Sequence, residues 1–298
     1  MSIPFRAESL GLVGGVTAVI GELIHDRLGL RYDPSQLDQM ADRLAPLVVA
    51  RGLGSFMDYY YALKYSDDPA EWGRVMDALS VPETYFWREI DQLRALVEHV
   101  VPGIVDESKG RPLRIWSVPC AGGEEPLTIA MLLDERGWFG RAPIEIAASD
   151  ASPAAVGRAR AGAYGPRAFR NLPPDLKERY FTPDGDRTWN VSPALHRRVS
   201  FDVVNLMDGD AVAAHACAPV VVCRNVFIYF SERSIRRVVD TFARSMRDPA
   251  VLCLGASESL LRLATPFELR EIGGAFMYVK AGAPAGATLA VAVRGERI

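Results

Sequence analysis

Two short apolar runs enclose a glycine-containing turn and a helical pattern between residues 113 and 150. LRIWSV (113–118) leads into the turn PCAGGEEP (119–126), and IEIAAS (144–149) ends directly at Asp150. Strands that alternate with helices predict a βαβ architecture with a mainly parallel sheet. The pattern continues downstream, with two more buried-strand candidates on either side of a helix expected from Ser231 to about Met246. These candidates are PVVVC (219–223) and AVLCLG (250–255).

Residues 1–90 carry helical spacing instead. Apolar side chains recur at helical intervals from Val16 to Leu28, and Gly29 is expected to end this first helix. Pro46 is expected to kink the second helix or to end it early. We predict an all-α N-terminal domain with these stripes as its core; a cofactor box built from them is the weaker alternative. The caps expected for the next three helices are Ser35, Ser55 and Asp68 followed by Pro69.

A connecting helix is expected from about Arg88 to Val105, so that a helix and linker over 91–112 join the two patterns. The α/β domain is expected over 113–285, with a tail over 286–298. Short β-prone pieces separated by turn residues between 180 and 205 do not fit the alternation. They predict an inserted antiparallel β-subdomain, with a long irregular loop as the alternative. In the tail, TLAVAV is either an added edge strand or part of a loosely ordered end.

The composition excludes several classes of protein. With 34 basic and 37 acidic residues, the net charge of −3 gives no basic surplus for general nucleic-acid binding. Four cysteines without a CxxC pair and four histidines argue against a Cys/His zinc site, and free thiols suggest a reducing cytosol. No basic, unbroken apolar start typical of a signal peptide and no bilayer-length apolar stretch is evident. A cytoplasmic protein without a metal or a membrane insertion is therefore expected.

A strand, a glycine-containing turn, a helix and a second strand ending in an acid are typical of a nucleoside site, where Asp150 would accept hydrogen bonds from ribose hydroxyls. The turn is not GxGxxG, which disfavours a dinucleotide. Glu124 and Glu125 would repel a pyrophosphate but suit a cationic ligand. S-adenosylmethionine (SAM) carries a sulfonium, an ammonium and a ribose without phosphate. The alternative for both glutamates is an ordinary acidic first helical turn, which fits Glu125 at least as well.

Five segments resemble the CheR-type methyltransferases, which transfer a methyl group from SAM to glutamate side chains of bacterial chemoreceptors. IWSVPCAGGEEPLTIAMLL (115–133) and VVVCRNVFIYFS (220–231) carry the most specific likeness. VPETYFWRE (81–89), IAASDASPAAVGRARAGAY (146–164) and LGASESL (254–260) with FMYVK (276–280) match in the same order. The resemblance spans about residues 16–280. It implies a helical N-terminal domain, a linker, and a SAM-methyltransferase α/β domain that carries a three-stranded antiparallel subdomain.

The resemblance also implies roles for individual residues. Arg88 would lie beside the methyl donor and help to hold the substrate carboxylate, and Tyr229 would face the transferable methyl. Thr84 and Arg88 are four residues apart, which predicts that they share one helical face. Glu124 would bind the amino-acid end of the donor and Asp150 its ribose. The remaining cofactor-binding residues implied by the resemblance are Asn205 and Leu206 at the adenine and Arg224 and Asn225 along the same pocket.

Plainer interpretations of these residues stay open: a solvated charge for Arg88, a core residue for Leu206, a helix cap for Asn225 and a packed aromatic for Tyr229. The sequence also departs from the family twice. Pro119 replaces a glycine in the turn, where it fixes φ and removes an N–H group, although Gly122 and Gly123 can restore freedom. Pro82 stands where some members have asparagine, so that one contact to the donor is lost.

The expected reaction is displacement of the sulfonium methyl by a glutamate carboxylate, with S-adenosylhomocysteine as the product. A carboxylate is ionised at pH 7, so no general base is required. The expected partner of this monomer is the cytoplasmic domain of a chemoreceptor or a related signalling-array protein. Residues 1–90 carry a net charge of −5, and Arg43 and Arg51 are the only cations of the second helix, so a basic recognition helix is not evident. A small-molecule SAM methyltransferase and a non-catalytic SAM-binding module are the rival hypotheses.

Overall fold

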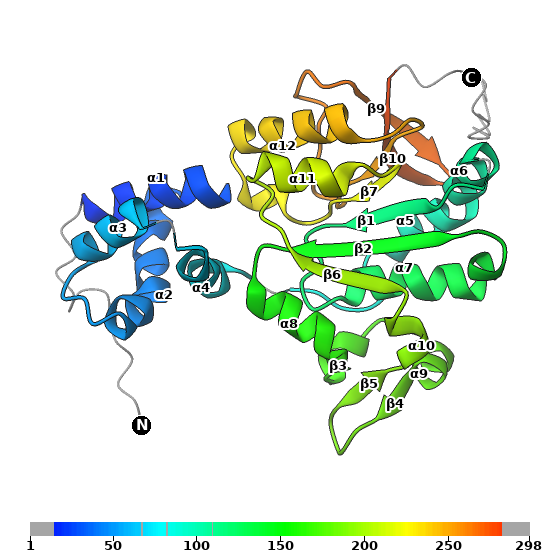
Figure 1. Ribbon diagram of the computed structural model, residues 1–298, viewed down its shortest axis with the longest axis horizontal. Coiled ribbons are helices and arrows are strands. Elements are labelled where there is room, and N and C mark those ends of the chain that lie inside the picture. The colour runs from blue at the N-terminus through cyan, green and yellow to red at the C-terminus, as the bar shows by residue number, and fades with distance from the viewer. Residues whose placement is uncertain (1–14, 67, 82, 109, 282–298) are drawn as a thin grey trace, which may run out of the picture.

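The computed structural model describes residues 15–66, 68–81, 83–108 and 110–281. A helical N-terminal domain lies beside a larger α/β domain, and a small second sheet projects from the α/β domain (Figure 1). The predicted fold class is confirmed. The TLAVAV segment of the tail and Pro82 lie outside the described residues.

Four helices form the N-terminal domain: α1 (Val16–Leu28), α2 (Leu37–Ala50), α3 (Phe56–Tyr65) and α4 (Pro69–Leu79). Three predicted boundaries are confirmed, because Gly29 adopts a left-handed conformation after α1 and both Ser55 and Asp68 accept hydrogen bonds from the first turns of their helices. The cap predicted at Ser35 is wrong. Asp33 instead forms a capping box with Gln36 around a short 3₁₀ turn that precedes α2.

Helix α2 does not end at Pro46 but continues to Ala50. Its buried face packs into the apolar core of the domain, and this packing holds the helix across the proline. The buried residues of α2 are Met40, Ala41, Leu44, Ala45 and Val48. Tertiary packing therefore outweighs the local cost of the proline.

The connecting helix begins later than predicted. It runs through α5 (Ile90–Ala95), a π-helical stretch over Leu96–Val100, and α6 (Val101–Ser108). Residues before it form a turn in which Trp87 and Glu89 have left-handed backbone angles, with φ of 70° and 48°. The prediction that Thr84 and Arg88 share a helical face is therefore wrong, since neither lies in a helix.

The large sheet has the strand order β6-β2-β1-β7-β8-β10-β9, and its first five strands are parallel. Its strands are β1 (Leu113–Ser117), β2 (Ile144–Asp150), β6 (Val199–Val203), β7 (Val220–Val222), β8 (Val251–Cys253), β9 (Phe267–Ile272) and β10 (Ala275–Lys280). One apolar core joins a face of the sheet to α5, α6, α7 (Glu124–Glu135) and α8 (Pro153–Ala161). A second core joins the other face to α11 (Gly209–Ala216) and α12 (Glu232–Ser245) (Figure 1).

The small antiparallel sheet differs from the predicted 180–205 subdomain in its strands. Its order is β3 (Ala163–Tyr164), β5 (Trp189–Val191), β4 (Phe181–Pro183), and the short helices α9 (Pro174–Tyr180) and α10 (Pro193–His196) accompany it. The segment predicted as its last strand is β6, which pairs in parallel with β2 at the edge of the large sheet. An edge strand exposes one face, so its alternating pattern resembles that of a solvent-facing antiparallel strand.

Phe230 joins the two domains, because its ring packs against the second core of the α/β domain and against the core of the helical domain. Its backbone pairs with Leu30 in an isolated antiparallel bridge. Beside it, the Arg31 amide donates to the Tyr229 carbonyl at 2.9 Å, and Asn205 Nδ2 donates to the Arg27 carbonyl at 2.8 Å. The connection that follows α1 is therefore fixed directly to the carboxyl end of the sheet.

Phe230→Ala should lower the free energy of unfolding by about 2 kcal/mol, because it removes apolar contacts from both cores at once. Urea unfolding measures the change. Phe276→Ala is the matched control, since that ring is 59% exposed and its loss should cost little. Equal effects of the two substitutions would contradict the joining role of Phe230.

Candidate active site between the two domains

A cavity of about 250 Å³ lies at the carboxyl ends of β1, β2 and β7, where residues of the helical domain form its opposite wall. Eight of the nine predicted site residues line it, namely Thr84, Arg88, Asp150, Asn205, Leu206, Arg224, Asn225 and Tyr229. The carboxyl ends of parallel strands are where ligands bind in open α/β sheets. The fold therefore brings together residues that are 145 positions apart in the chain.

Asp150 ends β2 and is 6% exposed. Its two carboxylate oxygens accept hydrogen bonds from the amides of Ala121 and Ser152, both at 2.9 Å. Burial raises the pKa of this carboxyl group. The turn that contains Ala121 uses left-handed angles at that residue and at Gly123, with φ of 47° and 93°. Despite Pro119, the turn thus directs one amide to the acid.

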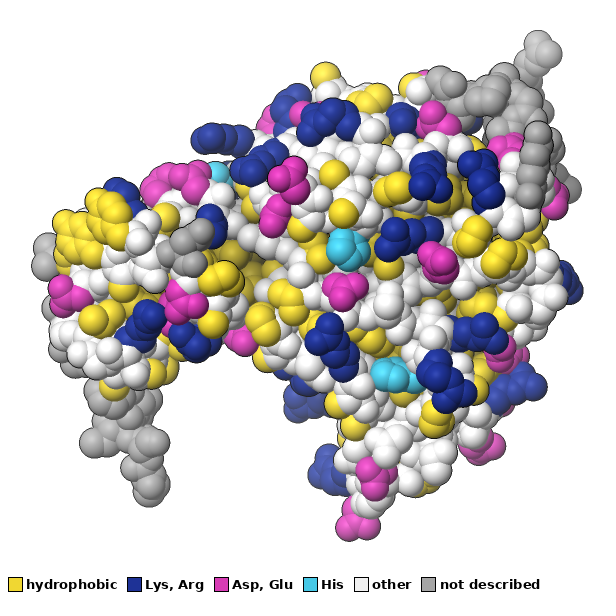
Figure 2. Space-filling model, in the orientation of Figure 1, with side chains coloured by type: hydrophobic (Ala, Val, Ile, Leu, Met, Phe, Trp, Pro, Cys, Tyr) yellow, Lys and Arg dark blue, Asp and Glu magenta, His cyan; other side chains and the backbone are white. Residues whose placement is uncertain are grey.

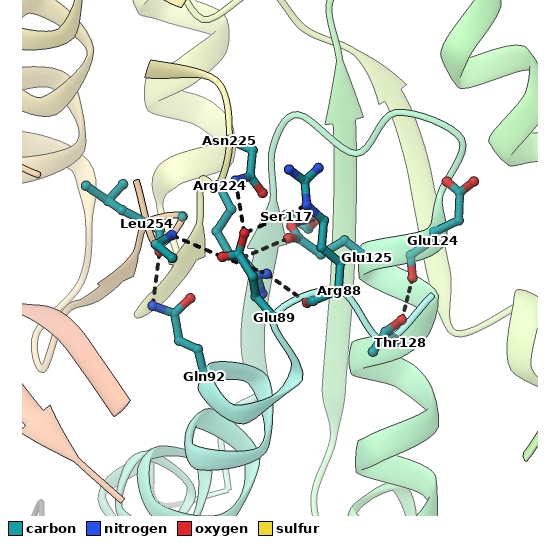
Figure 3. Close-up of polar contacts among 12 residues, drawn as sticks. Arg88, Glu89, Gln92, Ser117, Glu124, Glu125, Thr128, Arg224, Asn225 and Leu254 are labelled. Atoms are coloured by element: carbon teal, nitrogen blue, oxygen red, sulfur yellow. Dashed lines mark hydrogen bonds and ion pairs between the residues drawn. The ribbon is translucent and has the colours of Figure 1, made fainter. Parts of the chain in front are cut away.

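Glu124 is the predicted residue that does not line the cavity. It opens α7, lies against Gly122 and takes a side-chain hydrogen bond from Thr84. Its Oε2 atom is buried without a hydrogen-bond partner. Burial raises the pKa of Glu124 to about 7. Figure 3 shows its carboxylate pointing away from the cluster around Arg224, to which Glu125 belongs. The two acids of the turn therefore contact different groups.

Arg224 lies after β7 and is 3% exposed. Figure 3 shows it between two carboxylates, with nitrogen to oxygen distances of 3.3 Å to Glu89 and 3.5 Å to Glu125. Its Nη2 atom also donates to the Arg88 carbonyl at 2.8 Å. The Nε atom faces Glu125 in this ion pair, and Nη1 has no hydrogen-bond partner in the part of the chain that the structure describes. Arg224 therefore retains the Nη1 donor for an anionic group at the cavity wall.

Glu125 lines the cavity, although the sequence did not identify it as a site residue. It accepts a hydrogen bond from Ser117 at 2.8 Å, and burial raises its pKa. Nothing in the local sequence distinguishes it from a solvated acid of a first helical turn. Its partner Arg224 lies 99 residues away, and that pairing is visible only in the fold.

Arg88 and Tyr229 are more accessible. The Arg88 side chain is 26% exposed, and its Nη1 atom donates to the Glu83 carbonyl at 2.6 Å. Tyr229 is 38% exposed and closes a short 3₁₀ helix over Phe227–Tyr229. Both side chains line the cavity from segments outside the regular helices and strands of the sheet. They are therefore accessible to a second reactant that enters between the domains.

The helical domain contributes one wall of the cavity, in which Met40 and Leu79 of the predicted apolar stripes lie with polar residues that the stripes did not predict. The polar residues include Tyr32, Gln36, Gln39 and Arg43. Arg43 donates to the Leu79 carbonyl at 3.2 Å while lining the cavity. These polar residues lie off the apolar stripe, and the domain packing turns them toward the sheet. Arg51, which directly follows α2, is instead paired with Asp68 and Glu71.

The charges around the cavity fit SAM. Asp150 at the cavity suits the ribose hydroxyls, and Glu124, which lies behind the cavity residue Thr84, suits the ammonium group. The Nη1 atom of Arg224 suits a carboxylate. Among the described residues, no group of three or more His, Cys, Asp or Glu side chains is arranged to hold a metal ion. Within the same ranges, no helix has both the length and the apolar character needed to span a bilayer.

Glu124→Gln should stabilise the ligand-free protein at pH 8. The folded-state pKa of about 7 lies above the ordinary value of 4.5, so ionisation favours the unfolded chain and stability falls as pH rises through 7. A neutral glutamine removes this cost, which we expect to raise the free energy of unfolding by about 2 kcal/mol at pH 8 and little at pH 4.5. Urea unfolding at both values tests this. The exposed Glu268→Gln control should change little, and a destabilised Glu124→Gln protein at pH 8 would refute the prediction.

Comparison with known proteins gives matches over both domains. The model of the SAM-binding domain of CheR methyltransferases matches residues 82–274, and the model of their all-alpha domain matches residues 18–80. Chemotaxis protein methyltransferase 2 of Vibrio cholerae is 33% identical over 261 residues, covering 87% of this chain and 90% of that protein. Chemotaxis protein methyltransferase 1 of Pseudomonas aeruginosa is 34% identical over 209 residues, covering 68% and 76%. The probable biofilm formation methyltransferase WspC of Pseudomonas putida is 30% identical over 257 residues, covering 86% and 60%.

The two family models meet at the segment that carries Thr84 and Arg88, and together they cover the helical domain, the connecting helix and most of the large sheet. The cavity lies where these two matched domains face each other. This chain therefore belongs to the CheR methyltransferase family, as a SAM-dependent methyltransferase with an all-α N-terminal domain.

Proposed function

We propose that the protein transfers a methyl group from SAM to glutamate side chains of a chemoreceptor or a related signalling-array protein, forming γ-glutamyl methyl esters. The observation that carries this proposal is the cavity between the domains. It is lined by Asp150, which suits the ribose of the donor, and by the partly exposed Arg88 and Tyr229, which a second reactant can reach. A protein substrate that presents a glutamate would meet both domains at this opening.

Each charged residue would hold the group of the donor that its charge suits. Glu124 would pair with the ammonium group, Asp150 with the ribose hydroxyls, and Arg224 with the carboxylate. Thr84, Asn205, Leu206 and Asn225 would complete the site. Asp150 is held in place by two backbone amides, and Arg224 by Glu89 and Glu125, so these groups are oriented before the donor arrives.

When bound, the donor supplies an electrophilic methyl group. The glutamate carboxylate of the substrate is ionised at pH 7, so no side chain has to remove a proton from it. Arg88 would hold this carboxylate with the part of its guanidinium that does not contact Glu83, and Tyr229 would align the methyl. The role of the protein is then alignment and exclusion of water.

The proposed partner is acidic at the point of contact, since the reacting side chain is a glutamate. Arg43 and Arg31 line the cavity from the helical side and would face such a surface. The relatives are named as chemotaxis protein methyltransferases and as a probable biofilm formation methyltransferase, and the cytoplasmic part of a receptor would be the methylated region. We propose that the enzyme acts there as a monomer.

Labelled methyl transfer from SAM to membranes of the source organism tests the function. Base-labile label on a receptor-sized band supports it, whereas base-stable label indicates N-methylation, and label on small acids without protein indicates a small-molecule enzyme.

Arg88→Ala should lower kcat/KM about 100-fold and Tyr229→Phe about tenfold, because alignment is lost. Arg270→Ala on β9, whose side chain pairs with Glu268, is the control. Unchanged transfer by both site variants would refute the assigned roles.

The affinity for S-adenosylhomocysteine should depend on the ionisation of Glu124. Since its pKa is about 7, the fraction of ionised carboxylate falls about tenfold between pH 8 and pH 6, and affinity should fall with it. Glu124→Gln should bind about tenfold more weakly at pH 8 and show no such pH dependence. Isothermal titration calorimetry measures both. A wild-type affinity that is flat across this range would contradict the pairing with the ammonium group.

A further inference from the structure

Glu258 accepts hydrogen bonds from four backbone amides. Its Oε1 atom takes those of Val226 at 2.7 Å and Phe227 at 2.6 Å, and its Oε2 atom takes those of Asn225 at 2.7 Å and Gly255 at 2.7 Å. The structure records no ion pair between Glu258 and any cation among the residues it describes. Its charge is therefore held by backbone donors, and hydrogen bonds to a charged acceptor are the strong ones.

These amides belong to the two connections that leave neighbouring strands at the cavity. Residues 225–227 follow β7 and lead directly into the 3₁₀ helix that ends at Tyr229. Gly255 follows β8, which pairs in parallel with β7. A single carboxylate thus joins both strand ends and fixes the segment that carries Tyr229.

Two features show that the segment needs this support. Asn225 has a left-handed φ of 61°, a conformation that costs free energy in residues with a side chain, although asparagine tolerates it better than most. Gly255 approaches so closely that an added Cβ would lie 2.6 Å from Asn225 Nδ2 and 2.9 Å from Glu258 Oε2. Any side chain at position 255 would therefore displace Asn225 or Glu258.

A second carboxylate completes the arrangement. Glu89 accepts from Asn225 Nδ2 at 3.2 Å and from the Ala256 amide at 3.0 Å, while it pairs with Arg224. Asn225 is therefore held through its backbone by Glu258 and through its side chain by Glu89. Its orientation toward the cavity depends on both acids.

We propose that Glu258 is a positioning residue for methyl transfer, which acts by holding the segment from Asn225 to Tyr229 at the cavity. This inference rests on the proposed function and adds a residue that contacts neither the donor nor the substrate. Glu258 is not among the residues that line the cavity. Its effect on catalysis would pass through the geometry of Tyr229.

Glu258→Gln tests the proposal in the full chain. An amide has one acceptor oxygen, so two of the four backbone donors would face an NH₂ group and the segment should shift. We expect kcat to fall at least tenfold, because small displacements in an aligned site are costly. The affinity for S-adenosylhomocysteine should fall less than kcat, because Asn225 is the one residue assigned to the donor that lies in the displaced segment. In hydrogen exchange, peptides covering 224–230 and 254–258 should exchange faster and the remainder should not change.

Gly255→Ala is a second variant, which should displace the same segment from its other side and produce the same loss of kcat. Glu268→Gln, on the exposed face of β9, is the control and should behave as wild type. Unchanged kcat in Glu258→Gln would overturn the inference, as would a loss explained by weaker donor binding or by faster exchange throughout the protein. If wild type and control also fail to transfer methyl groups, the proposed function itself is wrong. If wild type and Glu258→Gln are equally active, only the inference about Glu258 is wrong.

Discussion

The site depends on the placement of one buried cation, Arg224. A guanidinium without water is costly unless carboxylates surround it, and here Glu89 and Glu125 do so. Glu89 precedes the connecting helix, Glu125 belongs to the first turn of α7, and Arg224 follows β7. The pairing therefore fastens three distant segments to one point below the cavity. The removal of Arg224 would leave two partly buried acids close together without a shared cation.

Most of the fold could be predicted from the sequence because its elements are strongly patterned. The strands β7 and β8 are continuous apolar runs, and β1 and β2 are mostly apolar, as expected for strands covered on both faces. The errors occur where one segment satisfies two patterns. β6 alternates like an exposed antiparallel strand because it forms the edge of the sheet, and Pro46 does not end α2 because the buried face of that helix is already packed.

Residues of the site could be predicted from the sequence where they belong to a local motif. The eight lining residues follow from motifs at strand ends and at the turn before the connecting helix. Glu125, Glu258 and Arg43 could not be identified in this way, since their roles come from partners far away in the chain. Glu125 requires Arg224, Glu258 requires the amides after β7, and Arg43 requires the domain packing.

The Arg31 amide donates a hydrogen bond to the Tyr229 carbonyl, next to the Phe230 ring that packs against the cores of both domains. This contact limits how the two domains can be separated. The segment that carries the tyrosine is also part of the contact with the helical domain. The α/β domain would lose this support if it were produced alone, although it contains the acids proposed to hold the donor. We therefore expect full activity to require both domains, and a ligand that shifts the helical domain would displace the segment of Tyr229 without entering the cavity.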